Sequence, residues 1–306
     1  MLIAHFSPNL FMAKFEEHVD GYEFLSNRCT KEVDIIYCGS VSELDKAMIA
    51  KEEFNKPLIC WVWDLPYCWR EWTRNNKDIR AHRWRDKYIK EVVSNLHKCN
   101  KVISASKYTQ RVLREKYNIE SKQIYFYIDT EEIDQIPTQD KADHIIQISR
   151  FALNKRFELS IQVAGSLNRK LICVGTGSYE HLQRWANSMS SNIDFYQNLE
   201  RKRTLILLKQ AKALVSPSVF EGWGITPIEA LYCGIPVLLN DLDVFREVYG
   251  DAVSYHKPDD PDDMREKLCY LLADKQLQRK MVEDCQPLIS DFTIAKFAKR
   301  WEKAIK

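Results

Sequence analysis

The sequence predicts an α/β protein built from two doubly wound domains. Short apolar segments of strand length alternate with longer segments of helical character, which is typical of parallel strands joined by right-handed crossovers. The alternation stops in a polar stretch at residues 134–143, which contains Pro137, and then starts again. The length of 306 residues fits two domains of about 150 residues each.

The first half of the chain contains five apolar segments of strand length. They are residues 2–6, 33–37, 57–63, 101–104 and 123–127. The intervening segments have helical spacing or helix-start residues, and we expect helices at 11–25, 41–54, 75–100 and 106–117. This half is therefore predicted to form one parallel sheet.

The second half repeats the pattern. We expect strands at 144–149, 171–174, 192–196, 213–216 and 236–239, and helices at 157–164, 179–187, 204–211, 227–233 and 262–272. We place the domains at 1–136 and 137–290, followed by an amphipathic terminal helix at 291–306. Ligands of such sheets bind at the carboxyl ends of the strands, so the expected site is the cleft between the domains.

The composition excludes several classes of protein. Hydrophobic residues make up 45% and charged residues 29% of the chain, which permits a sizeable core and argues against disorder. No apolar run approaches the roughly 20 residues that span a membrane, and we expect no signal peptide. The nine cysteines include no C-x-x-C pair, so we expect reduced thiols in the cytoplasm, without disulfides or a zinc ribbon. The net charge of +2 argues against a dedicated nucleic-acid binder.

The charge is concentrated in one segment. Residues 70–122 contain 15 Lys or Arg and 6 Asp or Glu, a local net charge of +9, which leaves 2 − 9 = −7 for the rest of the chain. Trp72 and Trp84 lie among these charges. A basic, aromatic segment attracts anions such as acidic glycans or an anionic membrane surface. The alternative is an ordinary helix with a solvated face.

One segment has the features of a phosphate site. Ser216 to Gly234 reads SPSVFEGWGITPIEALYCG: the end of a strand, a glycine-containing loop, and a helix expected to begin at Pro227 with Thr226 as its N-cap. The free N–H groups and partial positive charge of a helix start attract phosphate. Glycines in the loop allow the backbone to approach a ligand closely.

Two carboxylates bracket this loop. Glu229 has a structural explanation, because Thr226 to Glu229 has the spacing of a capping box, in which Glu229 would bond to the Thr226 N–H. Glu221 lies beside Gly222, where it caps no helix, and its alternative is simple solvent exposure.

These residues resemble a known family. Glu221 and Glu229 match the E-x7-E signature of the retaining GT-B glycosyltransferases of family 4, and the match continues through ALYCGIPV at 230–237, DVFREV at 243–248 and PDDP at 258–261. Upstream, SRFALNK at 149–155 resembles the family's GRLxxxKG. The resemblance is strong over about 144–272 and weaker over 57–133.

The resemblance implies a GT-B fold, with two Rossmann-like domains facing a central cleft and the terminal helix crossing back to the first domain. It implies that Arg150 and Lys155 hold the nucleotide diphosphate, and that Glu221 binds hydroxyls of the donor sugar. Growing charge on the leaving diphosphate explains the need for two cations. The alternative for the two cations is an ordinary basic loop.

The remaining donor contacts are also implied by the resemblance. Glu229 would accept hydrogen bonds from the ribose hydroxyls, and Leu199 lies in the loop expected to contact the base. The other residues expected to line the sugar-phosphate are Gly222, Trp223, Gly224, Ile225 and Thr226. On the acceptor side, His5 and Asp64 fall at predicted strand ends, with a loop or capping role as the alternative.

Three other motifs give weaker indications of function or none. Asp241-Leu242-Asp243 is a D-x-D triplet, but it occurs outside the fold in which that triplet binds metal, so we expect no metal site. Gly175-Thr176-Gly177 lacks the third glycine of a dinucleotide fingerprint and is expected to be a βα turn near the donor. The sequence has no P-loop motif.

The resulting hypothesis is a metal-independent, retaining glycosyltransferase without a cofactor. It would move a hexose from a UDP- or GDP-sugar to a hydroxyl acceptor, a saccharide or lipid-linked glycan. We expect no nucleic-acid partner and a cytoplasmic location, with peripheral membrane contact through residues 70–122 if that segment meets lipid. Two alternatives remain: a catalytically weak nucleotide-sugar-binding subunit, motivated by the short first domain, and a nucleotide-sugar epimerase.

Overall fold

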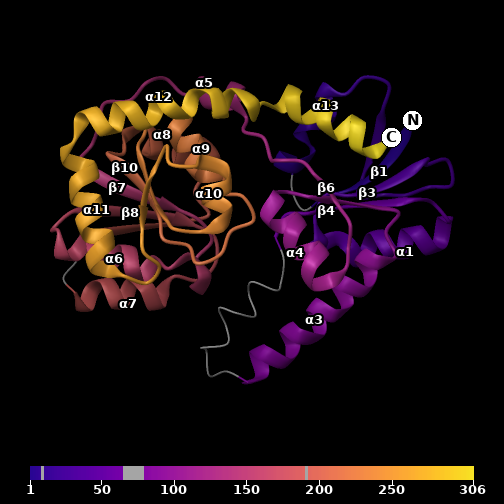
Figure 1. Ribbon diagram of the computed structural model, residues 1–306, viewed down its shortest axis with the longest axis horizontal. Helices are drawn as coiled ribbons and strands as arrows, with labels where there is room; N and C mark the ends of the chain where they lie inside the picture. The colour runs from indigo at the N-terminus through magenta and orange to yellow at the C-terminus, as the bar shows by residue number, and fades with distance from the viewer. Residues whose placement is uncertain (8–9, 65–78, 190–191) are drawn as a thin grey trace. The chain divides into compact units, whose positions relative to one another are not determined.

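The computed structural model describes the chain except residues 8–9, 65–78 and 190–191 (Figure 1). The chain divides into two compact units. Unit 1 contains Met1–Tyr127 and Phe292–Lys306, and unit 2 contains Ile128–Asp291. The sequence predicts this boundary about nine residues later, at 136, because residues 134–143 have the polar character of a linker.

Unit 1 is built around a parallel sheet of six strands in the order β2-β1-β3-β4-β5-β6. Its strands are β1 (Leu2–Phe6), β2 (Glu23–Ser26), β3 (Ile35–Cys38), β4 (Leu58–Val62), β5 (Lys101–Ser104) and β6 (Lys122–Gln123). Its helices are η1 (Leu10–His18), η2 (Val41–Glu43), α1 (Leu44–Phe54), α3 (Ile79–His97), α4 (Lys107–Tyr117) and α13 (Ile294–Ile305). β4 is buried along its whole length, as expected for a central strand covered on both faces.

Helix α13 belongs to unit 1. Its residue Trp301 is fully buried, and the indole ring lies 4.9 Å from the ring of Phe15 and 5.3 Å from that of Tyr37, centroid to centroid. At its carboxyl end, Lys101 Nζ donates to the carbonyls of Ala304 and Ile305 at 3.3 and 3.2 Å, which satisfies acceptors left open by the end of the helix.

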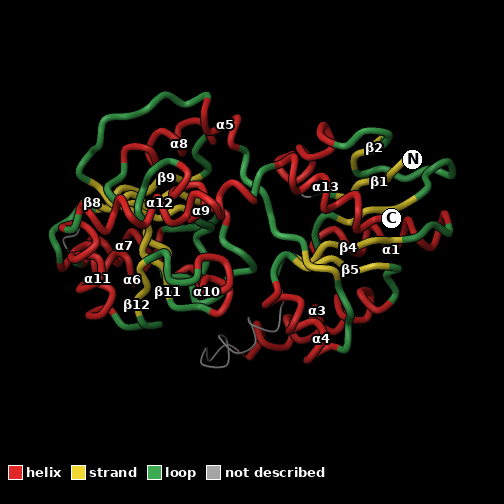
Figure 2. Tube along the Cα trace, turned by 45° about the horizontal axis from the view of Figure 1, so that its top comes forward, coloured by secondary structure: helices red, strands yellow, loops and turns green. Residues whose placement is uncertain are grey.

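Unit 2 also contains a parallel sheet of six strands, in the order β12-β11-β10-β7-β8-β9. Its strands are β7 (His144–Ile148), β8 (Lys170–Gly175), β9 (Ile193–Gln197), β10 (Ala213–Ser216), β11 (Val237–Asn240) and β12 (Ser254–His256). Its helices are α5 (Thr130–Asp134), η3 (Leu153–Lys155), α6 (Phe157–Ser166), α7 (Glu180–Ser188), α8 (Arg201–Gln210), α9 (Ile225–Tyr232), α10 (Asp243–Tyr249), α11 (Pro261–Ala273) and α12 (Lys275–Asp291). In each unit the strands gather at the centre with helices around them (Figure 2).

The strand order of unit 2 fixes where a ligand can bind. From β7 the chain proceeds through β8 to β9 on one side, and then returns to add β10 on the other side of β7. The direction of winding therefore reverses between β7 and β10. The loops after these two strands diverge at such a switch point, which leaves a crevice at their carboxyl ends.

The structure confirms the predicted α/β class with two doubly wound units and corrects some elements. The helix expected at 11–25 was wrong beyond His18, because η1 ends there and Glu23–Ser26 forms strand β2. The strand expected at 123–127 is reduced to Lys122–Gln123. Within the described residues, no helix is long and apolar enough to span a membrane.

Candidate functional site

Lys155 and Glu221 meet at the switch point of unit 2. Lys155 is the last residue of η3, just after β7, and Glu221 lies in the loop after β10. Lys155 Nζ donates to Glu221 Oε1 at 2.6 Å, and the two side chains are only 9% and 18% exposed. A cation and a carboxylate are thus held together at the sheet edge where doubly wound folds bind ligands.

Buried hydrogen bonds hold both loops in place. Gln147 Nε2, inside β7, donates to the carbonyl of Lys155 at 2.7 Å. The Val219 N–H donates to the carbonyl of Asn154 at 2.9 Å, which joins the loop after β10 directly to η3. The loop after β10 is also fixed from β11, because Asn240 Nδ2 donates to the carbonyl of Ser218 at 3.0 Å.

The start of α9 corrects the sequence prediction. The helix begins at Ile225 with Gly224 at the N-cap position, and no side chain caps it. Thr226 is therefore the second residue of the helix and not its N-cap. Because Pro227 has no N–H, the free donors of the first turn come from its neighbours, and this turn, with its partial positive charge, follows directly on the loop that contains Glu221.

Gly224 is required at this helix start. Its φ is +95°, which side chains rarely adopt, and a Cβ would lie 2.6 Å from the Phe245 ring. The Tyr249 hydroxyl donates to the Gly224 carbonyl at 3.1 Å. The left-handed conformation lets the helix begin two residues earlier than the proline suggested. Beside it, Trp223 is buried, with 1% exposure of the whole residue, so its indole is not presented at the surface.

Glu229 is paired with a residue that the sequence analysis missed. Its side chain is 4% exposed. The carboxylate accepts a hydrogen bond from each terminal nitrogen of Arg201, and the distance from Nη1 to Oε2 is 3.1 Å. Burial raises the pKa of Glu229, and the attraction of Arg201 opposes that rise. Glu229 therefore faces Arg201 instead of closing a capping box with Thr226. The spacing along the chain gave no signal for this pair, since its members are 28 residues apart.

Arg150 and Leu199 lie on the same sheet edge. Arg150 follows β7 and is exposed, and the described residues contain no ion-pair partner for it. Leu199 follows β9 and is half-buried. The structure does not join either residue to the pair formed by Lys155 and Glu221.

The predicted βα turn follows β8. Gly175 cannot carry a side chain, since a Cβ would lie 2.0 Å from the Ser149 carbonyl oxygen. The Asn198 N–H donates to the Gly175 carbonyl at 2.8 Å, and Gln197 Nε2 donates to the Gly177 carbonyl at 2.9 Å. The turn therefore supports the loop that contains Leu199.

His5 and Asp64 both belong to unit 1. His5 is fully buried, its Nδ1 contacts the Glu16 carboxylate, and its ring centroid lies 4.9 Å from that of Tyr37. A Cβ on Gly39 would lie 2.8 Å from His5 Nε2. The imidazole is enclosed in the structure, and the acceptor contact of His5 stays a prediction. Asp64 follows β4, is half-buried, and adjoins the undescribed residues 65–78.

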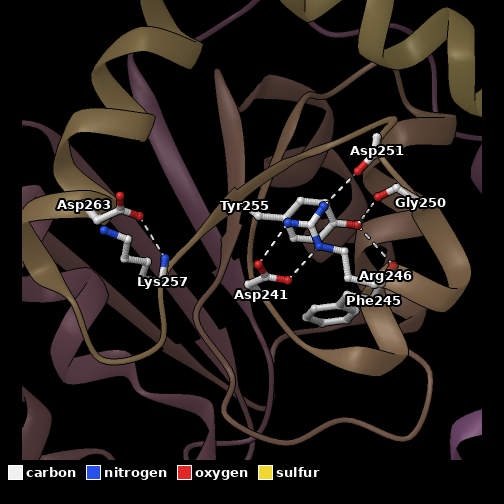
Figure 3. Close-up of polar contacts among 8 residues, drawn as sticks. All are labelled: Asp241, Phe245, Arg246, Gly250, Asp251, Tyr255, Lys257 and Asp263. Carbon is white, nitrogen blue, oxygen red and sulfur yellow. Dashed lines mark hydrogen bonds and ion pairs between the residues drawn. The ribbon is translucent and has the colours of Figure 1, made fainter.

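The D-x-D triplet has a structural role (Figure 3). Asp241 accepts hydrogen bonds from Arg246 Nε at 2.7 Å and Nη2 at 2.9 Å, and Arg246 lowers the pKa of this carboxyl. Arg246 also contacts Asp251, and its guanidinium lies 3.8 Å from the centroid of the Tyr255 ring. Asp241 thus fixes α10 to the preceding loop. Across the described part of the chain, no cluster of side chains is suited to a metal ion.

A family model and similar proteins of known name both point to glycosyltransferases. A family model described as glycosyl transferases group 1 matches residues 129–286. The chain is 27% identical over 219 residues to the O-antigen chain mannosyltransferase RfbU of Salmonella typhimurium, covering 67% of this chain and 62% of that protein. It is 30% identical over 112 residues to a phosphatidyl-myo-inositol mannosyltransferase of Mycolicibacterium smegmatis, covering 36% of this chain and 29% of that protein. The chain thus spans less than two thirds of either relative.

Solved structures share the fold. Sucrose-phosphate synthase from Thermosynechococcus elongatus matches with a TM-score of 0.78 and 14% identity, covering 99% of this chain and 98% of that one. Anabaena HepE in complex with UDP-glucose matches with a TM-score of 0.78 and 14% identity, covering 100% of this chain and 99% of that one. At these identities the likeness establishes the two-domain, Rossmann-like α/β fold alone.

Proposed function

Because this chain belongs to the glycosyl transferases group 1 family, we propose that it moves a hexose from a nucleoside-diphosphate sugar to a hydroxyl acceptor. The observation that carries the proposal is the Lys155–Glu221 pair at the switch point of unit 2, 2.6 Å apart and largely buried. These are the two kinds of group that a donor needs: a cation for the diphosphate and an acceptor for sugar hydroxyls.

The leaving group explains the cations. When the bond between the sugar and the diphosphate breaks, negative charge grows on the phosphate oxygens. Lys155 pairs with Glu221 in the loop that leads into α9, and the unpaired N–H groups at the start of that helix favour the same charge. Arg150, exposed on the edge after β7, supplies a second cation to the diphosphate. Positioning of the substrates and stabilisation of this charge would lower the activation barrier of the transfer.

Donor binding exchanges the partners of the pair. In the structure described here Lys155 and Glu221 neutralise each other. A bound donor gives Lys155 a phosphate oxygen and gives Glu221 the sugar hydroxyls, so neither charge is left buried without a partner. Gly222 and the backbone of 223–226 line the sugar-phosphate, Glu229 takes the ribose hydroxyls, and the loop with Leu199 contacts the base.

The reaction that we propose retains the configuration of the sugar and requires no metal ion or cofactor. The acceptor oxygen bonds to the anomeric carbon on the face that the diphosphate leaves, and the hydroxyl proton passes to the departing phosphate oxygen. Lys155 and Arg150 then hold the charge that a metal ion holds in other transferases.

The acceptor that we propose is a saccharide or a lipid-linked glycan. The similar proteins include O-antigen chain and phosphatidyl-myo-inositol mannosyltransferases by name. Exposed basic residues of unit 1 support contact with an anionic surface such as a membrane. In the described part of residues 70–122 they include Lys87, Lys90, Lys98, Lys107, Arg111 and Arg114. Asp64 remains the candidate on the acceptor side.

The test is a panel of nucleotides and nucleotide sugars. UDP, GDP and their hexose conjugates are added to the protein, and the shift in melting temperature is measured. A ligand at about 100 times its Kd stabilises a protein by about 2.7 kcal/mol. We expect one base to shift the melting temperature, and its sugar to be hydrolysed slowly without acceptor. The proposal fails if no nucleotide of the panel stabilises the chain.

A further inference from the structure

Arg201 connects three helices of unit 2. It is the first residue of α8, and its terminal nitrogens contact Glu229 of α9, while its Nε donates to Glu132 Oε2 of α5 at 3.0 Å. The helices α5, α8 and α9 are neighbours in the fold (Figure 1). All three nitrogens of the guanidinium donate to carboxylates, so its position and orientation are fixed.

We propose that Arg201 is a positioning residue for nucleotide recognition, which holds the Glu229 carboxylate ionised and in one orientation so that it can accept the ribose hydroxyls. This inference rests on the proposed function, because that function assigns the ribose to Glu229. Arg201 itself need not touch the nucleotide. It therefore differs in role from Lys155 and Arg150, which would bind the diphosphate.

Burial is what makes such a residue necessary. The Glu229 side chain is 4% exposed, and a carboxylate taken out of water tends to bind a proton unless a cation faces it. A protonated Glu229 would offer a weaker acceptor and one donor in place of two strong acceptors. The paired form avoids this loss, since a guanidinium fits both oxygens of a carboxylate at once.

The pair with Arg201 does not use up the hydrogen-bonding capacity of Glu229. Each carboxylate oxygen has two lone pairs, so an oxygen that accepts from Arg201 can accept a second hydrogen bond. Two neighbouring hydroxyls match two oxygens whose plane Arg201 fixes. A carboxylate free to rotate would have to be ordered on binding, at a cost in affinity.

Glu132 gives Arg201 its own support. It lies in the first turn of α5, where its N–H donates to Asp129 Oδ1 at 2.9 Å. The carboxyl end of the same short helix is held by α8, since Lys209 Nζ donates to the carbonyl of Ile133 at 2.8 Å. Arg201 is therefore held by Glu132 at Nε as well as by Glu229 at the two terminal nitrogens, and loss of Glu132 should loosen the pair without removing it.

The experiment compares a ribose nucleotide with its 2′-deoxy form. Affinities for UDP and 2′-deoxy-UDP, or for GDP and 2′-deoxy-GDP if GDP binds more tightly, are measured by calorimetry for the wild type and Arg201→Gln. We expect the wild type to prefer the ribose form by roughly tenfold, the effect of one hydrogen bond to a charged group. Arg201→Gln should weaken the ribose form far more than the deoxy form, so that the preference approaches one.

Three further variants sharpen the result. Arg203→Gln removes an exposed arginine from the same helix and should keep the wild-type preference. Arg201→Lys keeps the positive charge but cannot bond both carboxylate oxygens in parallel, so its preference for the ribose nucleotide should be intermediate. This variant also provides the test if Arg201→Gln does not fold. Glu132→Gln should narrow the preference less than Arg201→Gln does.

The outcomes separate this inference from the proposed function. If Arg201→Gln and Arg201→Lys bind nucleotide with the same ribose preference as Arg203→Gln, Arg201 does not position Glu229 and the inference is overturned. A wild type with no ribose preference also overturns it. If the wild type binds neither UDP nor GDP, the proposed function itself fails.

Discussion

The two units of this protein have similar sheets but very different switch points. In unit 1 the winding reverses between β1 and β3, and in unit 2 between β7 and β10. His5, the last residue but one of β1, is fully buried among aromatic rings. The corresponding edge of unit 2 holds Lys155 and Glu221 as a largely buried ion pair. The fold therefore supplies an edge, and the residues after each strand decide whether it is packed or can bind a ligand.

Helix α13 contributes to this difference. Trp301 and Phe297 both pack against Phe15, and Trp301 also packs against Tyr37, a neighbour of His5. The last helix of the chain thus helps to complete the aromatic cluster around His5. At the switch point of unit 2, by contrast, the loops after β7 and β10 are joined by hydrogen bonds instead of aromatic packing. Arg150 is exposed there.

The largest effect is expected from removing the aromatic packing of unit 1. Trp301→Ala should lower the free energy of unfolding by about 3–5 kcal/mol, since a fully buried indole is lost. The measurement is chemical denaturation, with nucleotide affinity determined on the protein that remains folded. We expect that affinity to be unchanged, because the nucleotide site belongs to unit 2. A large loss of affinity in the folded variant would break the separation between the two units.

Glu221→Gln should act mainly on function, although the loss of its charge leaves the buried Lys155 without an anionic partner and should also cost some stability. We expect turnover to fall by roughly 100- to 1,000-fold, the effect of removing one group that stabilises a transition state, while nucleoside-diphosphate affinity changes little. Glu266→Gln, an exposed glutamate on α11, is the control. Equal losses of turnover and of nucleotide binding would indicate that Glu221 only supports the loop.

Lys155→Ala should weaken nucleoside-diphosphate binding by about 1–3 kcal/mol, the value of a charge-assisted hydrogen bond. Arg150→Ala should weaken it by less, because Arg150 is exposed and solvent screens its charge. Calorimetry with UDP and GDP measures both. Unchanged affinity in Lys155→Ala would remove the diphosphate assignment.

The smallest expected effect is a pH dependence of nucleotide affinity. Burial raises the pKa of Glu229, with Arg201 opposing and Glu132 and Asp129 reinforcing the rise. The ionised carboxylate is the better acceptor for ribose, so affinity should be full above this raised pKa and fall as the pH drops through it. Stability has the opposite sign, because a raised pKa in the folded state means that burying the ionised form costs stability at higher pH. Calorimetry from pH 7 downwards should show weaker binding to the ribose form and a smaller change for 2′-deoxy nucleotide.

The sequence allowed the fold to be predicted because its signals are local. Apolar strands and intervening helices alternate along the chain, and their order restricts the topology. Lys155 and Glu221 could be proposed as partners in one site because each follows a strand in a recognisable motif. Strand β2 was missed because four residues after a 3-10 helix, Glu23–Ser26, give too little periodicity.

What could not be predicted depends on contacts between distant residues. Arg201 pairs with Glu229 across 28 positions, and the helix that carries it was expected to begin only at 204. Nothing local marks His5 as enclosed, since the rings around it come from 15, 24 and 37. The start of α9 depends on the close approach of Gly224 to the Phe245 ring. The sequence gives no sign of this contact, and Pro227 favours a later start.

The central claim is that the Lys155–Glu221 pair opens to receive a nucleoside diphosphate. A crystal structure of the protein with the nucleotide selected by the thermal panel tests this most directly. We predict a diphosphate oxygen within hydrogen-bonding distance of Lys155 Nζ, with the ribose on Glu229 and the pair with Glu221 broken or shared. A nucleotide bound elsewhere, with Lys155 and Glu221 still joined at 2.6 Å, would contradict it.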